Sequence, residues 1–110
     1  MSDLSQRKCV PCEGGSVPLS ISDVKAHLQK ISGWATTTDF KKISKEFKFK
    51  TFVDSIQFVN EAARIAEEEG HHPDLSIRYT KVLVELSTHA IDGLSQNDFI
   101  LAAKIDDIRL

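Results

Sequence analysis

The feature that most restricts the fold of this chain is a change of periodicity at residues 70–73. Before it, over residues 51–69, apolar side chains recur at helical spacing, and after it, over residues 75–86, they alternate as in strands. Gly70 can end a helix by adopting a positive φ, and Pro73 holds the residue before it in an extended conformation. The sequence therefore predicts a long helix, starting at residue 51 or 54, that turns sharply into a pair of strands.

Similar patterns place the remaining elements on either side of this corner. A short helix is predicted over about residues 20–31, and two strand-like segments within residues 34–49 are predicted to form an antiparallel hairpin. A last helix is predicted over about residues 96–108, with Ser95 as N-cap and Asp98 completing a capping box. Together these elements predict an α+β fold: a single-domain, four-stranded antiparallel sheet with three helices packed on one face, in the order α-β-β-α-β-β-α.

Two faces of these elements carry specific expectations. The long helix is predicted to bury a broad apolar stripe of Phe52, Ile56, Val59, Ala62, Ala63 and Ala66. Phe58 and Ile65 widen that stripe on one flank, which indicates either deeper burial or a subunit contact. In the first hairpin, alternating lysines are predicted to point toward water: Lys41, Lys42, Lys45, Lys48 and Lys50.

The composition is that of one globular domain. The chain has 110 residues, of which 41% are hydrophobic and 27% charged, and its formal net charge is −2. This charge and the dispersed lysines argue against direct nucleic-acid binding, and no segment approaches the ~18 apolar residues of a membrane span. We expect a cytoplasmic protein, with a nuclear location also compatible; organelle targeting stays open if an N-terminal extension has been removed.

Residues 1–18 are predicted to form a flexible N-terminal arm, and residues 19–110 the folded domain. The arm is polar, lacks a period and contains two prolines and a pair of glycines. Cys9 and Cys12 form a CxxC motif, but neither the βαβ context of a redox pair nor the second ligand pair of a zinc site accompanies it. We interpret both as reduced cysteines of a mobile arm, with a redox or metal role as the alternative.

Three of the four histidines belong to the corner and to the strand end beyond it. Glu67 lies one helical turn before His71 and His72, and His89 follows the last strand, in phase with the face opposite the core. Imidazole gains and loses a proton near neutral pH, so this cluster suits acid–base chemistry. Neighbouring side chains in a tight corner diverge, which suits a flat ligand better than a single metal ion. A metal-dependent hydrolase is therefore the weaker interpretation, and His27, in the first helix, is left outside the site.

The chain resembles the pterin-4a-carbinolamine dehydratase family in an ordered set of motifs: Glu67-x-x-x-His71-His72-Pro73, a strand pair, Ser87-Thr88-His89 and Gly93-Leu94-Ser95. The segments Lys8 to Gly15 and Gly33-Trp34 resemble the arm and first strand of many members, so the likeness covers about residues 9–108. Two positions depart from the common pattern. Gly70 stands where many relatives have an acidic residue, and Leu75 stands where many have a tryptophan, which removes an aromatic contact.

The resemblance implies dehydration of 4a-hydroxytetrahydropterin to quinonoid dihydropterin in tetrahydrobiopterin recycling, with no metal and no organic cofactor. It implies that the catalytic acids and bases are His71, His72 and His89, and that the substrate-binding residues are Glu67, Pro73, Ser87 and Thr88. It also implies a homodimer or homotetramer with a pterin as its small-molecule partner. The alternative is a protein-interaction module, since some relatives act as dimerisation cofactors of a transcription factor. Which histidine is the acid and which the base stays open.

Overall fold

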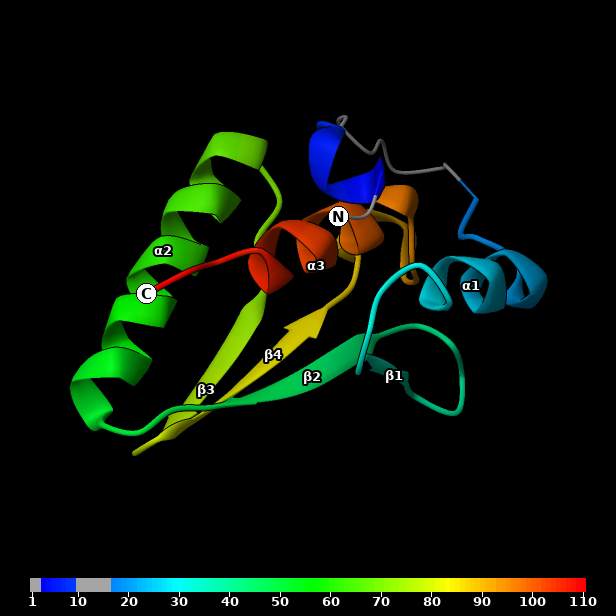
Figure 1. Ribbon diagram of the computed structural model, residues 1–110. Helices are drawn as coiled ribbons and strands as arrows, with labels where there is room; N and C mark the ends of the chain where they lie inside the picture. Colours follow the sequence, from blue (N-terminus) through cyan, green and yellow to red (C-terminus); the bar gives the residue numbers. More distant parts are fainter. Residues whose placement is uncertain (1–2, 10–16) are drawn as a thin grey trace.

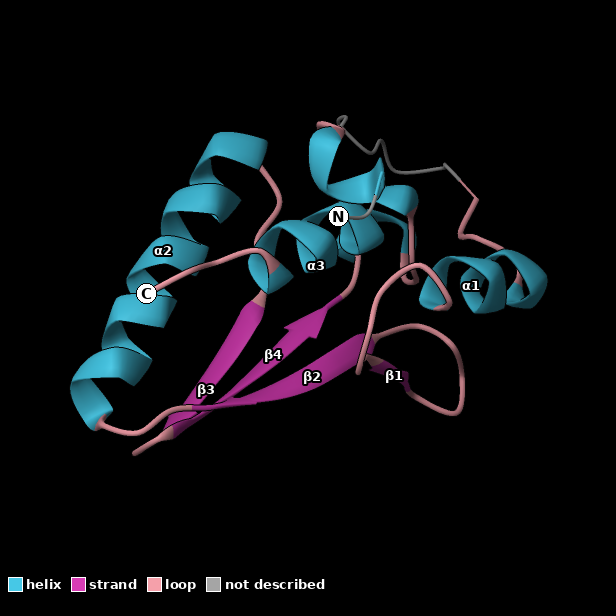
Figure 2. Cartoon of the chain, in the orientation of Figure 1, coloured by secondary structure: helices cyan, strands magenta, loops and turns pink. Residues whose placement is uncertain are grey.

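The computed structural model of the protein describes residues 3–9 and 17–110, and it confirms the predicted α+β fold (Figure 1). The strands form one antiparallel sheet in the order β1-β2-β4-β3. Their bounds are β1 Ala35–Thr36, β2 Ile43–Lys48, β3 Asp74–Arg78 and β4 Lys81–Leu86. The helices are α1 Ile21–Leu28, α2 Phe52–Glu69 and α3 Gln96–Asp106, with short 3-10 helices η1 Asp3–Gln6 and η2 His89–Ile91. Figure 2 shows α2 and α3 lying over the same face of the sheet.

Capping residues set the starts of the three α-helices and the end of α2. Ser20 and Thr51 cap α1 and α2, each side chain accepting a hydrogen bond from a backbone N–H three residues later. Gly70 ends α2 in the left-handed conformation with φ 65°, which confirms the predicted stop. Ser95 and Asp98 form the predicted capping box at the start of α3. Local chemistry therefore determines where each helix begins and where α2 ends.

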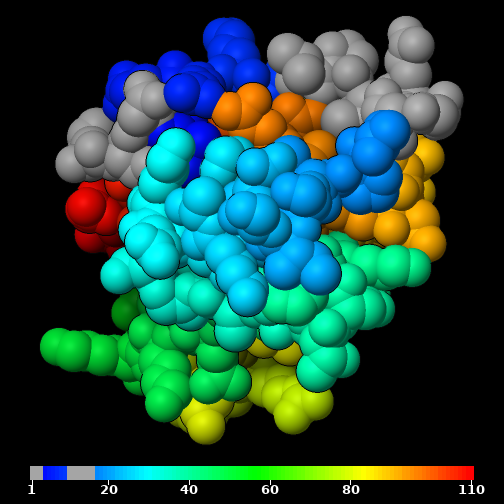
Figure 3. Space-filling view, turned by 90° about the vertical axis from the view of Figure 1, so that its right-hand side faces the viewer, coloured from blue at the N-terminus to red at the C-terminus, as the bar shows by residue number. Residues whose placement is uncertain are grey.

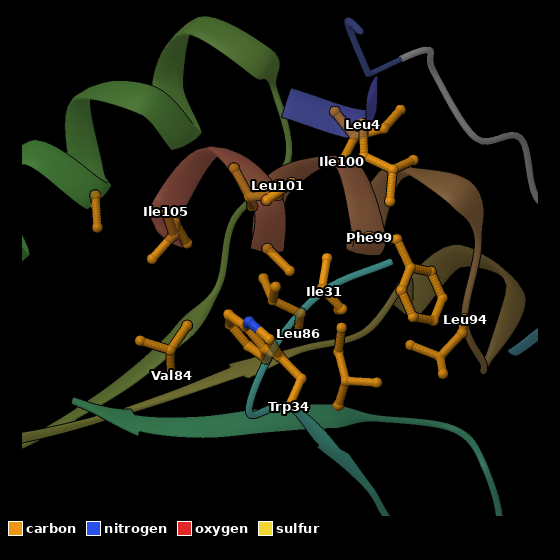
Figure 4. Packing of buried hydrophobic residues seen from close by; sticks show 14 of the residues in the cluster. Leu4, Ile31, Trp34, Val84, Leu86, Leu94, Phe99, Ile100, Leu101 and Ile105 are labelled. Carbon is orange, nitrogen blue, oxygen red and sulfur yellow. The ribbon is translucent and has the colours of Figure 1, made fainter. Parts of the chain in front are cut away.

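The core lies between the sheet and the helices. Where the two hairpins join, Val84 of β4 pairs with Lys45 of β2, and within the second hairpin it pairs with Leu75 of β3, so alternate residues share the helix-facing side. Figure 4 shows side chains from β4 and α3 meeting in this layer. The largest fully buried apolar residues are Phe99, Leu4, Ile43, Leu86, Leu94, Leu101, Ile105, Val24, Val82 and Val84. Within the described residues, no helix is long and apolar enough to cross a membrane.

The buried face of α2 differs from the prediction. Phe52 is 48% exposed and Ala63 is also exposed, so the stripe predicted around them is wrong at these two positions. The residues that α2 buries are Ser55, Phe58, Ala62 and Ala66. Phe58 packs in the core with its ring centroid 4.6 Å from that of Phe47, so of the two predicted alternatives for this residue deeper burial is confirmed. The helix carries apolar residues on more than one face, and packing on the sheet selected one of them.

Lys45 is an exception to the predicted row of solvent-facing lysines. Its side chain lies on the helix-facing side of β2, where the Nζ donates to Asp106 Oδ1 at 2.8 Å and to the Ser32 carbonyl at 2.8 Å. Asp106 also accepts a hydrogen bond from Trp34 Nε1 at 2.9 Å through its other oxygen. The prediction is wrong here because alternation along β2 places residue 45 in phase with the core residues. This lysine ties the end of α3 to the sheet.

The predicted N-terminal arm is packed where the structure describes its beginning. Asp3–Gln6 forms η1, which lies on α3, and the Leu4 side chain is 1% exposed within the core cluster. Burying one leucine side chain contributes about 1.5–3 kcal/mol toward holding this segment in place. The prediction of an unpacked arm is therefore wrong for η1. Residues 10–16 of the predicted arm, Cys12 among them, lie outside the described residues.

Candidate functional site

A hollow of about 610 Å³ opens between the C-terminal end of α2, the start of β3 and the segment that follows β4. Its volume is in the range of small-molecule pockets. All seven residues that the sequence proposed for the site line it: Glu67, His71, His72, Pro73, Ser87, Thr88 and His89. The other lining residues are Cys9, Glu68, Glu69, Gly70, Asp74, Ala90 and Asn97.

Chain reversals on both sides of the hollow bring these residues together. Gly70 stops α2, and the chain enters β3 at Asp74, so the two histidines occupy the corner between helix and strand. After β4, Thr88 and Gly93 pair as an isolated antiparallel bridge, with the Thr88 N–H donating to the Gly93 carbonyl at 2.8 Å. This bridge closes a loop that contains η2 and presents His89 opposite the corner. The predicted position of His89 at a rim after the last strand is confirmed.

The inner wall is a buried histidine–carboxylate pair. His71 Nε2 lies 2.6 Å from Asp98 Oδ1, and the side chains are 12% and 0% exposed. The second oxygen of Asp98 accepts hydrogen bonds from Thr88 Oγ1 at 2.7 Å and from the Ser95 N–H at 3.0 Å. Every one of these donors is held by secondary structure or by the loop bridge. The orientation of the His71 ring is therefore set by α3 as well as by its own corner.

These contacts specify where the protons of the inner wall lie. An ionised carboxylate only accepts hydrogen bonds, so the proton of neutral His71 lies on Nε2 and its Nδ1 carries the free lone pair. The hydroxyl of Thr88 gives its one proton to Asp98 and therefore accepts from Ser95 Oγ, 2.7 Å away. In this tautomer the Nδ1 atom of His71 can accept a hydrogen bond.

The outer wall holds a second pair with the same chemistry and the opposite environment. His72 Nε2 lies 2.5 Å from Glu67 Oε2, and these side chains are 61% and 78% exposed. As predicted, the adjacent histidines diverge: His71 reaches inward to α3, and His72 reaches back along α2 to Glu67. Solvent competes for the outer pair, which leaves it free to rearrange around a bound molecule.

His27 lies outside the hollow, as the sequence suggested. Its ring packs edge-on against Phe99, with centroids 5.1 Å apart, and its Nδ1 is buried without a hydrogen-bond partner among the described residues. Burial, and secondarily the charge of Lys30, holds the pKa of His27 below its ordinary value. This histidine is a packing residue of α1.

Three contributors to the site were not predicted from the sequence. Asp98 was expected only as a helix cap, although its place directly before the apolar run Phe99–Ala103 is a signal that it points into the interior. Cys9 lines the hollow, although its segment was predicted to be mobile. Glu69 accepts a hydrogen bond from the Cys9 N–H at 2.8 Å, and no local pattern indicates a contact across sixty residues of chain.

The donor set of the site is one of imidazoles and carboxylates, joined in pairs. Within residues 3–9 and 17–110, no group of three or more His, Cys, Asp or Glu side chains is arranged to hold a metal ion. What the arrangement can do is move protons on both sides of a molecule that occupies the hollow. The individual roles of the seven predicted residues stay predictions.

Comparison with known proteins places the chain among pterin dehydratases. The family model of pterin 4 alpha carbinolamine dehydratase matches residues 17–108. A protein of Halorhodospira halophila named "Putative pterin-4-alpha-carbinolamine dehydratase" is 43% identical over 103 residues, which is 94% of both chains. A protein of Nitrosospira multiformis with the same name is 45% identical over 108 residues, covering 98% of this chain and 94% of the relative.

Solved structures give the same result for the fold. The crystal structure of the transcriptional coactivator/pterin dehydratase from Brucella melitensis is 32% identical and matches with a TM-score of 0.77, over 81% of this chain and 95% of that one. A pterin dehydratase-like protein identified as a RuBisCO assembly factor in the alpha-carboxysome is 23% identical, with a TM-score of 0.59 over 67% of this chain and 86% of that one. The second likeness shows a shared fold alone.

Proposed function

The chain belongs to the pterin 4 alpha carbinolamine dehydratase family, and from that premise we propose that it is an active enzyme that converts 4a-hydroxytetrahydropterin to quinonoid dihydropterin and water. The role would be the recycling of tetrahydrobiopterin. The observation that supports this proposal best is that three imidazoles and four carboxylates line one hollow, with one histidine buried and paired and its neighbour exposed.

The reaction needs one proton delivered and one removed. The C–O bond of the carbinolamine breaks and the hydroxyl leaves as water, so a group must protonate the leaving oxygen. A proton on a ring nitrogen must depart, and its bonding pair forms the new C=N bond. Two groups that titrate near neutrality can perform both steps without a metal, each typically contributing about 10²- to 10⁴-fold to the rate.

The geometry favours the inner histidine as the proton acceptor. His71 presents the free lone pair at Nδ1, and once protonated it would be stabilised by Asp98, a buried carboxylate at 2.6 Å. His72 and His89 are exposed at the other walls and are the candidates for proton delivery to the leaving hydroxyl. Glu67 would orient His72, and Ser87, Thr88 and the backbone at Pro73 would line the pterin.

The direct test is a stopped-flow assay of carbinolamine decay with and without the protein. We expect decay to accelerate in proportion to protein concentration and to be unaffected by extensive chelation checked by elemental analysis. A decay rate equal to that of buffer would refute the proposal. Activity that is lost on chelation and restored by zinc would refute its metal-free form.

We also propose that the protein assembles as a homodimer or a dimer of dimers. Four large apolar side chains are exposed near the start of α2, on the edge strand β3 and in the turn that follows β3: Phe52, Val53, Ile77 and Tyr79. A sheet edge and an exposed apolar patch are both surfaces that proteins usually cover. Light scattering at micromolar concentration should report a mass of two or four chains, and a monomer would contradict the proposal.

The second candidate function is a protein-interaction module that acts as a dimerisation cofactor of a transcription factor. It is favoured by the same apolar patch, and the Brucella melitensis relative is described as both a coactivator and a dehydratase. The two functions are separable. A variant with Phe52 and Val53 changed to serine should lose self-association if the patch is an interface, whereas the contacts of His71 do not involve that patch.

A further inference from the structure

Part of the pocket wall comes from a segment that the family model does not include. The model match begins at residue 17, yet Cys9 lines the hollow together with His71, Thr88 and Asn97. Figure 3 shows the dark blue atoms of this N-terminal segment packed against the orange atoms of the chain that leads into α3. The segment is therefore placed to contact whatever fills the hollow.

Four contacts hold the segment in this place. Leu4 anchors it in the core, and Lys104 Nζ of α3 donates to the Ser5 carbonyl at 3.1 Å. At the pocket, the Cys9 N–H donates to Glu69 Oε1 at 2.8 Å and its Sγ lies 3.6 Å from the Asn97 carbonyl. Lys104 also lies 3.9 Å from Glu69 Oε2, with both side chains mostly buried. Lys104 of α3 thus holds the start of the segment, and Glu69 of α2 holds its end.

We propose that Cys9, at the end of the packed segment from Leu4 to Cys9, forms a wall of the substrate pocket, and that Glu69 is a positioning residue that holds Cys9 against the bound pterin. This inference rests on the proposed function, because it takes the hollow to be the pterin site. It assigns Glu69 a role different from that of its neighbour Glu68, which is exposed and pairs with Arg64. It also assigns Cys9 to substrate recognition, whereas the sequence suggested a reduced cysteine in a mobile arm.

The chemistry of the thiol suits contact with a flat ring. Burial, and next the charge of Glu69, raises the pKa of Cys9 to about 12, so its sulfur is a neutral thiol at neutral pH. A neutral sulfur is polarisable and packs favourably against aromatic surfaces. Such a contact is present in the ground state and in the transition state alike, so it strengthens binding without altering the chemical step. We therefore expect that losing this contact raises KM and leaves kcat unchanged.

The first experiment measures protection of Cys9 by a pterin. A Cys12→Ser variant keeps Cys9 as its single thiol, and its alkylation by iodoacetamide at mildly alkaline pH is followed by mass spectrometry. The probe is 7,8-dihydrobiopterin, which lacks the leaving hydroxyl, and its binding is measured separately by calorimetry. At a probe concentration of about 20 Kd we expect alkylation about 20-fold slower, because only the unliganded fraction reacts.

The outcomes of this experiment are distinguishable. Dihydrobiopterin that binds without slowing alkylation would overturn the wall and leave the proposed dehydratase intact. Dihydrobiopterin that does not bind would overturn the pterin site and, with it, the inference. Alkylation of Cys9 that slows in proportion to the occupancy by dihydrobiopterin supports both the pterin site and the wall.

The second experiment separates positioning by Glu69 from a merely structural role. Glu69→Ala removes the acceptor of the Cys9 N–H and should raise KM about 10-fold with kcat within about twofold. Glu69→Gln retains a carbonyl oxygen that can accept the same bond and should restore most of the KM. Glu61→Ala, an exposed carboxylate of the same helix, is the matched control and should change neither constant.

Two further results would decide the matter. An unchanged KM in Glu69→Ala, or an equal KM in the alanine and glutamine variants, would overturn the positioning role. Should the alanine variant prove poorly folded by circular dichroism, Cys9→Phe tests the same wall without touching Glu69. Its larger side chain should fill part of the hollow and weaken dihydrobiopterin binding at least about 10-fold; unchanged binding would overturn the proposal.

Discussion

Two histidines that are neighbours in the chain, His71 and His72, occupy opposite environments in the structure. Each bonds a carboxylate through Nε2, at 2.6 Å for Asp98 and 2.5 Å for Glu67. The inner pair is buried and its carboxylate accepts two further hydrogen bonds, whereas the outer pair is mostly exposed. The same chemical unit is thus present once as a buried part of the fold and once as an exposed surface pair.

The comparison shows how burial changes the free energy that a contact contributes to folding. Removing one partner of a buried pair leaves a charge or a polar atom without solvent, which costs several kcal/mol, whereas an exposed pair contributes only about 0–1 kcal/mol because water replaces the lost partner. The inner pair should therefore couple activity to folding stability. The outer pair should affect activity alone.

The largest effect should come from Asp98. Asp98→Asn removes the charge that His71, Thr88 and Ser95 share, and we expect the free energy of unfolding to fall by about 3 kcal/mol. The loss of the His71 orientation should also lower kcat by at least about 10-fold. Urea unfolding and the stopped-flow assay measure the two effects, and a variant of normal stability and normal rate would erase the distinction between the pairs.

The two histidines themselves provide the next test. His71→Ala and His72→Ala should each lower kcat by about 10²-fold, the usual loss of one acid–base group. Their stabilities should differ: His71→Ala leaves Asp98 Oδ1 unpaired and should cost about 1–3 kcal/mol, whereas His72→Ala should stay within about 0.5 kcal/mol. Near-normal kcat in a well-folded double variant would remove the catalytic assignment and favour the interaction module.

Glu67 should show a smaller effect, confined to activity. Glu67→Gln keeps the size of the side chain and weakens its hold on His72, so we expect kcat/KM to fall about 10-fold. The thermal midpoint should not move, because the pair is exposed to solvent. A drop in the midpoint comparable to that of Asp98→Asn would mean that the outer pair supports the fold as well.

The smallest effect concerns His27, a half-buried histidine whose Nδ1 has no hydrogen-bond partner within the described residues. Its pKa is lowered by burial, so between that value and about 6.5 the unfolded chain binds more protons than the folded one. The contribution of neutral His27 to the free energy of unfolding is therefore fully present above pH ~6.5. It is lost as the pH falls through the pKa of His27 in the folded state. His27→Gln should make the urea midpoint less sensitive to acid, and an unchanged pH dependence would contradict this account.

Much of this molecule is visible in local sequence because local chemistry produces it. Gly70 and Pro73 stop a helix by backbone sterics, and Ser95 with Asp98 caps one by hydrogen bonds that span three residues. Alternation along the strands predicts which valines face the helices. The seven proposed site residues gather at one hollow because the corner after α2 and the loop after β4 are both short.

The expectations that failed concern choices between faces and contacts between distant segments. The apolar surface of α2 is broad, and only docking on the sheet and α3 decided that Phe58 is buried and Phe52 exposed. Lys45 was assigned to water by its charge, but its partner Asp106 lies sixty-one residues away. The choice of face on α2 leaves no local trace in the sequence, whereas the phase of Lys45 along β2 does, although the identity of its partner does not.

The sequence by itself therefore determined the order of the elements, the positions where most of them begin and end, and the cluster of histidines, since each depends on residues within a few positions of one another. Only the tertiary structure decided that Asp98 faces His71, that Leu4 enters the core, and that Glu69 holds Cys9 at the pocket. These contacts join residues that are far apart in the chain, and their free energy arises from burial, which no local pattern records.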